Sequence, residues 1–128
     1  MKLRIKGNSL RLRLAQQEVL QLKEKGIVQE TIKFGIGEPN QLKYIIRKSV
    51  DQEIKAYFNQ NRMLVEIPDA MAMEWATTAQ VGLEHTMSIN EEEDLYILIE
   101  KDFKCLQPRP NEDESDLFTN PSKESHNC

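Results

Sequence analysis

The chain has 128 residues, a length typical of one domain. Charged residues make up 30% of it and the net charge is -4, which argues against a simple nucleic-acid binder. It has no apolar run of the roughly 18 residues that a membrane span needs. Its first residues alternate charged and apolar side chains, unlike a signal peptide, and two cysteines cannot form a disulfide scaffold. We therefore expect a cytoplasmic protein.

The charge is divided unevenly along the chain. Residues 1–64 hold 13 of the 17 Lys and Arg but six of the 21 acids, so they carry +7, whereas residues 65–128 carry -11. Either the two halves attract each other or face different partners, or the surface charges simply cluster at random.

The first residues predict a hairpin followed by a helix. Residues 2–6 and 10–14 alternate apolar and charged side chains, and residues 7–9 between them have turn chemistry. Residues 16–25 change to helical spacing, and Gly26 suits the left-handed position after a helix.

The rest of the chain predicts six more strands and a second helix. Pro68 suits the first turn of that helix, in which Met71 and Trp75 are expected to face one way. The strands are expected at residues 27–34, 42–48, 54–58, 63–67, 81–89 and 95–100.

A shift of 53 residues superposes these elements without a gap. Leu22 falls on Trp75, Val28 on Val81 and Ile46 on Ile99, with eight identities in the 49 pairs over residues 2–50. The shared apolar phase and turn positions favour an internal duplication over generic patterning. The predicted fold class is α+β, with a duplicated ββαββ unit whose eight mostly antiparallel strands form a curled sheet or partial barrel with two helices. The domain is expected over residues 1–106, with halves 2–50 and 55–103, and an acidic tail over residues 107–128.

The first candidate site is the charged face of the first hairpin, which we call the cationic ladder: Lys2, Arg4, Lys6, Arg11 and Arg13. Five cations on one face repel each other unless solvent or an anion separates them, and Arg binds phosphate or carboxylate with two prongs. The ladder is either an anion site or a solvated outer face. The anion site would be favoured if the face turned into a barrel, because buried cations need partners.

The second candidate site is the tail. Pro108 and Pro110 break regular structure, and an acidic run with an apolar pair follows. We expect the tail to fold back on its own domain and to shield or regulate the ladder. The docking residues would be Glu112, Asp113, Glu114, Asp116, Leu117 and Phe118.

An alternative is a zinc-dependent protein or enzyme. Thiolate and imidazole are preferred zinc ligands, and Cys105, His126 and Cys128 supply them. No Cys-x-x-Cys pair is present, so a half-buried Cys105 and a free terminal thiol are the simpler interpretation, and a Cys105–Cys128 disulfide would need an oxidising compartment. No nucleophile elbow, Walker loop or dinucleotide fingerprint occurs. Whether the protein is an enzyme stays open.

Residues 2–14 resemble the start of a family of small uncharacterised bacterial proteins, and residues 100–106 and 112–116 also resemble that family. The resemblance implies a free-standing cytoplasmic bacterial protein and no particular activity. The leading hypothesis is a small binding domain for an anion or an acidic peptide, without a cofactor. We expect no nucleic-acid or membrane partner, and a monomer or small homo-oligomer.

Overall fold

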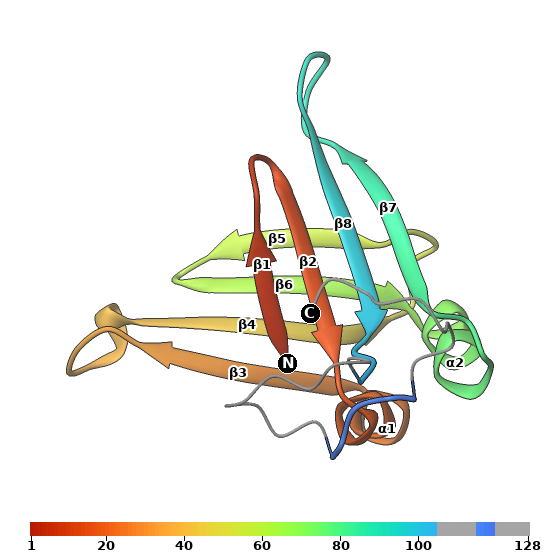
Figure 1. Ribbon diagram of the computed structural model, residues 1–128. Helices are drawn as coiled ribbons and strands as arrows, with labels where there is room; N and C mark the ends of the chain where they lie inside the picture. Colours follow the sequence, from red (N-terminus) through yellow and green to blue (C-terminus); the bar gives the residue numbers. More distant parts are fainter. Residues whose placement is uncertain (105–114, 120–128) are drawn as a thin grey trace.

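The computed structural model describes residues 1–104 and 115–119 (Figure 1). Its α-helices and strands follow the order ββαββ twice, which confirms the α+β class. The elements are β1 Lys2–Ile5, β2 Ser9–Leu14, α1 Gln16–Lys25, β3 Ile27–Lys33, β4 Gln41–Ser49, β5 Lys55–Asn59, β6 Arg62–Pro68, α2 Asp69–Thr77, β7 Gly82–Ser88 and β8 Asp94–Lys101, with a short 3-10 helix at Glu38–Asn40 before β4.

The strands form two four-stranded mixed sheets, with the orders β1-β2-β8-β7 and β3-β4-β6-β5. The outer pairs of each sheet are antiparallel, and the central pairs β2/β8 and β4/β6 are parallel. The expectation of one curled sheet or partial barrel is therefore wrong. Each half of the chain gives one pair of strands to each sheet, and the two sheets pack as separate layers with their own edges.

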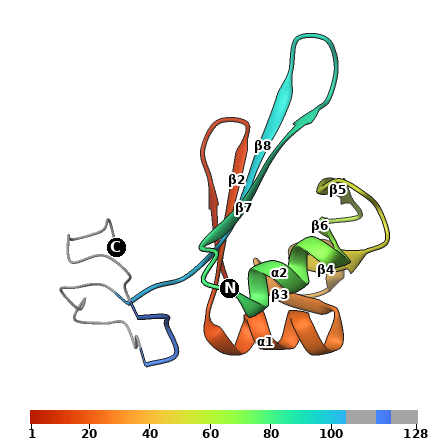
Figure 2. The ribbon, with the colours of Figure 1, turned by 90° about the vertical axis from the view of Figure 1, so that its right-hand side faces the viewer.

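The two sheets face each other, and the strands of one cross those of the other (Figure 1). Helices α1 and α2 lie next to each other at one end of the space between the sheets (Figure 2). The hairpin of β7 and β8 projects beyond the rest of the molecule in both views. Among the described elements, no helix covers the outer face of either sheet (Figures 1 and 2). Arg13 and Glu100 lie on the outer face of the first sheet, and Arg47 and Glu66 lie on that of the second.

The core lies between the sheets and against the helices, because alternate positions of the strands point inward and most of these are apolar. Trp75 is fully buried and donates a hydrogen bond from Nε1 to the Val81 carbonyl (3.0 Å). Contrary to the predicted helix face, Met71 is exposed, and Ala72 is the buried partner of Trp75 on α2. The fully buried large side chains are Trp75, Leu12, Leu14, Leu22, Ile46, Ile67, Ile97, Ile99 and Val65.

The two halves share their pairing register over most of their length. Leu12 pairs with Ile99, and Val65 pairs with Ile46, so a shift of 53 residues exchanges the two parallel ladders. The gapless match nevertheless fails at one strand. Val28 is opposite Ile46, but it is Leu83, and not Val81, that is opposite Ile99. The second half therefore has two more residues before β7 and two fewer in the following loop.

Within the described residues, no helix is long and apolar enough to cross a membrane.

Candidate anion-binding site

The cationic ladder lies on the outer face of the first sheet. Leu10, Leu12 and Leu14 of β2 are buried in the core, so the intervening Arg11 and Arg13 point away from the second sheet. The antiparallel register places Arg4 opposite Arg11 and Lys2 opposite Arg13. The ladder is therefore a row of like charges at the surface, and not the lining of a barrel.

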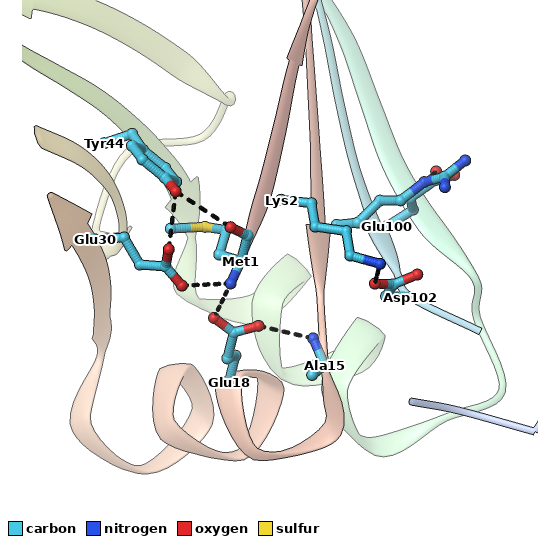
Figure 3. A network of polar contacts seen from close by, with 9 residues as sticks. Met1, Lys2, Ala15, Glu18, Glu30, Tyr44, Glu100 and Asp102 are labelled. Carbon is cyan, nitrogen blue, oxygen red and sulfur yellow. Dashed lines mark hydrogen bonds and ion pairs between the residues drawn. The ribbon is translucent and has the colours of Figure 1, made fainter. Parts of the chain in front are cut away.

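Strand β8 supplies carboxylates to part of the ladder. Glu100 Oε1 accepts hydrogen bonds from Nε of Arg11 (2.6 Å) and from Nε of Arg13 (2.7 Å). Beyond the end of β8, the buried Asp102 accepts from Lys2, with 2.9 Å between Oδ2 and Nζ (Figure 3). Three of the five cations thus have a charged partner within their own sheet or directly after it.

Arg4 and Lys6 have no ion pair with any of the described residues. Both line an open pocket of about 280 Å³ on the outer face, next to the turn of the first hairpin. The pocket is lined by Arg4, Lys6, Ser9, Leu10, Arg11, Tyr96 and Leu98. The pocket therefore combines Arg4 and Lys6, which have no ion pair with the described residues, with Arg11. The Nε of Arg11 donates to Glu100, and its other guanidinium N–H groups take no part in that hydrogen bond.

The other polar groups of this pocket are already engaged. Tyr96 donates its hydroxyl hydrogen to Glu84 (2.6 Å), and Ser9 donates to the Lys6 carbonyl (2.5 Å). The hydrogen bond to Glu84, followed by burial, raises the pKa of Tyr96 above its ordinary value of 10.0. The phenol is therefore neutral at physiological pH, and the positive charge of the pocket is not offset by a phenolate.

A second open pocket, of about 420 Å³, lies on the outer face of the second sheet. It is lined by Glu38, Pro39, Gln41, Lys43, Gln60, Asn61 and Arg62. Ser9 and Tyr96 of the first pocket correspond to Arg62 and Lys43 under the shift of 53 residues. The sequence pattern predicts that Lys43 lies in a strand and Arg62 beside one. It cannot show that β4 pairs with β6 and brings their side chains together.

The N-terminal amine forms a network that the sequence analysis missed (Figure 3). The Met1 amine binds the carboxylates of Glu18 on α1 and Glu30 on β3. Tyr44 on β4 donates to Glu30 (2.8 Å), and Glu18 also accepts from the backbone N–H of Ala15 (2.9 Å). The only sequence signal was Glu30, a charged residue in phase with the core position Val28.

The charges of this network stabilise one another. Burial alone would lower the pKa of the Met1 amine, but hydrogen bonds and charge from Glu18 and Glu30 outweigh it and raise the pKa above 8.0. Burial alone would raise the pKa of Glu30, but hydrogen bonds from the Met1 amine and Tyr44 outweigh it and lower the pKa. Burial and the bond to Glu30 raise the pKa of Tyr44 to about 12. The protonated amine thus ties the start of β1 to α1 and β3.

The described part of the tail, residues 115–119, contacts the start of α1 and the chain after β8. The Asp116 carbonyl accepts from the Gln16 backbone N–H (3.1 Å), and Leu117 is buried. The Phe118 N–H donates to the Asp102 carbonyl (2.8 Å), and its ring packs against that of Phe103 with 5.6 Å between centroids. The tail backbone thereby supplies a cap to a helix whose N-cap residue, Ala15, has no capping side chain.

The remaining predicted residues lie outside the described part of the chain. These are the acidic residues Glu112, Asp113 and Glu114 and the proposed zinc ligands Cys105, His126 and Cys128. Among residues 1–104 and 115–119, no group of three or more His, Cys, Asp or Glu is arranged to hold a metal ion. The zinc alternative stays a prediction, which metal analysis of the purified protein would test.

Comparison with known proteins places the chain in a family but gives it no activity. No curated protein and no solved structure matched it. A family model described as a family of unknown function, DUF7009, matches residues 1–122. The α+β chain therefore belongs to the DUF7009 family of unknown function.

Proposed function

We propose that this protein is a small anion-binding domain whose site is the pocket formed by Arg4, Lys6 and Arg11. The observation that carries the proposal is the selective pairing of the cationic ladder. Glu100 pairs with both Arg11 and Arg13 and Asp102 pairs with Lys2, whereas Arg4 and Lys6 have no ion pair among the described residues and line one pocket. Such adjacent like charges are destabilising until an anion lies between them.

The chemistry of the pocket favours a ligand that carries phosphate or clustered carboxylate groups. Arg4 and Arg11 are opposite each other in register, so a multivalent anion can receive hydrogen bonds from both guanidinium groups and charge from Lys6. Leu98, which is the register partner of Arg11, adds an apolar contact that a bare inorganic ion would not use. An organic phosphate or an acidic peptide fits this combination better than a simple salt anion.

Thermal shift measurements with pyrophosphate and with citrate would test the site. A ligand that binds only the folded state raises the melting temperature in a saturable way. We expect such a rise for the wild type at low ionic strength and its loss in the double variant Arg4→Glu/Lys6→Glu. The matched control is Lys43→Glu/Arg62→Glu, which reverses two equally unpaired cations on the other sheet and should retain the rise.

The proposal fails if neither probe raises the melting temperature of the wild type. It also fails if the rise persists in the Arg4→Glu/Lys6→Glu variant, because the ladder would then be only a solvated face. A rise lost in both double variants would indicate a general response to net charge, and it would contradict a specific site as well.

We also infer that the two ββαββ halves arose by duplication. The shared 53-residue register of the central ladders supports this. Aligning the halves of other family members would test it. Matched apolar positions in both halves would support duplication, and their restriction to this chain would contradict it.

We also propose that the acidic tail regulates the anion site. The protein would be bacterial and cytoplasmic, like the family that its first hairpin resembles. The tail is anchored beside the ladder, because Phe118 is bonded to the backbone of Asp102, whose carboxylate binds Lys2. Anion titration of a chain truncated after residue 106 would test the regulation, with tighter binding expected if the tail competes.

A further inference from the structure

Lys43 and Arg62 form an unpaired cationic pair on the outer face of the second sheet. Lys43 of β4 is the register partner of Arg62 of the parallel strand β6, and neither has an ion pair with the described residues. Four residues further along the same ladder, Arg47 is neutralised by Glu66 (3.0 Å). Like charges opposite each other reduce the stability of a sheet, so this pair is suited to binding a counter-charge from outside.

The surroundings of this pair favour an acidic polypeptide over a free small anion. Gln41, Gln60 and Asn61 line the same pocket with amide groups, which offer acceptors as well as donors. Glu38 adds a carboxylate acceptor, which can accept a hydrogen bond from a peptide N–H. A site with cations for carboxylates and mixed groups for backbone atoms matches the needs of an acidic loop.

The chain itself presents such a loop. Glu91, Glu92, Glu93 and Asp94 follow one another at the tip of the β7–β8 hairpin, and all four are exposed. None of them has an ion pair with the described residues. We call residues 90–94 the acidic loop. Ile89, which precedes it, is 53% exposed and adds an apolar contact surface.

A molecule holds its own acidic loop away from its own Lys43–Arg62 pocket. Asn8 Nδ2 donates to the Asp94 carbonyl (2.6 Å), so the base of the loop is fixed to the turn of the first hairpin. The loop lies at the tip of the first sheet, whereas the β5–β6 turn and the start of β4 lie at a separate end of the second sheet (Figure 1). The complementary charges can therefore meet only between two molecules.

We propose that the Lys43–Arg62 pocket docks the acidic loop of a second copy of this chain. The contact joins different surfaces of the two molecules, so it gives a ring where the geometry closes and a chain where it does not. Its strength depends on ionic strength, because the charges are exposed. It is independent of the proposed anion site on the first sheet, which uses other cations.

Sedimentation velocity of the full chain at about 50 mM and about 500 mM NaCl would test this contact, since the higher salt screens exposed charges. We expect concentration-dependent association at low salt that the high salt suppresses. Two charge-reversal variants, Glu91→Lys/Glu92→Lys/Glu93→Lys in the loop and Lys43→Glu/Arg62→Glu in the pocket, should each be monomeric. Each should weaken self-association by at least about tenfold, because both create like-charge contacts.

Mixing the two variants provides the decisive step. The loop variant keeps an intact pocket and the pocket variant keeps an intact loop, and the reversed loop and the reversed pocket are also complementary to each other. Their equimolar mixture should therefore associate again at low salt. A wild type that stays monomeric at low salt would overturn the proposal, as would a mixture that stays monomeric. Association that is lost in Arg4→Glu/Lys6→Glu but kept in Lys43→Glu/Arg62→Glu would also overturn it, since the loop would then dock at the other pocket.

Discussion

At the scale of single residues, what matters is which charges have partners. On the first sheet, Arg13 forms an ion pair with Glu100. The shift of 53 residues places Glu66 at the position of Arg13 and Arg47 at the position of Glu100, so the second sheet has the same ion pair with the charges exchanged. Both ion pairs lie on outer faces, where such pairs add little stability. Their larger effect is to set the charge that each face presents to a ligand.

Glu100→Gln should therefore raise the affinity of the first pocket for pyrophosphate. The change removes the negative charge that Arg11 and Arg13 share, and we expect the dissociation constant to fall roughly fivefold, which corresponds to about 1 kcal/mol for one short-range charge interaction in water. Isothermal titration at low salt would measure it. Glu66→Gln is the matched control on the other sheet and should leave the affinity unchanged. Weaker binding in Glu100→Gln would show that the carboxylate orients the site and does not oppose it.

The network at the N-terminal amine should make the free energy of unfolding depend on pH at both acidic and alkaline pH. The amine pKa is raised in the folded state, so its contribution is complete below about 8.0 and is lost as the pH rises through the folded pKa. The Glu30 pKa is lowered, so its contribution is complete above about 4.5 and is lost as the pH falls through the folded pKa. Tyr44, with a pKa of about 12, stays protonated throughout.

Urea unfolding across this pH range would measure the effect, with Glu30→Gln as the test variant. We expect the variant to lose the acid-side dependence of the unfolding free energy and to weaken the alkaline-side one. Glu24→Gln, an exposed change on α1, should keep the wild-type profile. If the Glu30→Gln profile matches the wild type, the amine does not bind this carboxylate in solution.

At the scale of the elements, the sequence was sufficient wherever the signal was local. The period-two alternation of residues 10–14 and the change to helical spacing before Gly26 identify β2 and α1 to within a residue or two. In α2 the local signal misled, because Met71 and Ala72 are both apolar neighbours and only the packing against the sheets decides which one is buried. The unfavourable Ala15 N-cap also has an explanation that the sequence did not give: the missing partner comes from the distant Asp116 carbonyl.

The docked tail segment should contribute measurably to stability. Leu117 is buried, so Leu117→Ala should reduce the free energy of unfolding by about 2 kcal/mol, the low end of the range for buried leucines. Thr119→Ala changes an exposed neighbour and serves as control. Urea unfolding at neutral pH would compare them. Equal stabilities would mean that residues 115–119 do not hold this position in solution.

At the scale of the whole molecule, the sequence predicted the elements but not their assembly. A partial barrel and two crossed sheets use the same strands, and which strand lies beside β8 depends on contacts between residues nearly 90 positions apart. The alternation of charged and apolar residues along the first hairpin was enough to predict the cationic ladder. It could not predict the Lys43–Arg62 pair, because these two residues meet only through the pairing of β4 with β6.

The assembled molecule separates its charges more sharply than its net value of -4 suggests. Cations are left unpaired, among the described residues, in a pocket on each outer sheet face, and four consecutive acids project from the β7–β8 hairpin. The positive first half and negative second half thus do not simply cancel. They form separate surfaces, which we propose bind an anion and a second copy of the chain.

The most direct test of the anion site is a two-dimensional ¹⁵N–¹H NMR titration of the full chain with pyrophosphate at low salt. The account predicts saturable shifts concentrated at the amides of residues 4–11 and 96–98, around the pocket of Arg4, Lys6 and Arg11. Small shifts spread over all surface cations would contradict it, and so would saturable shifts centred anywhere else on the molecule.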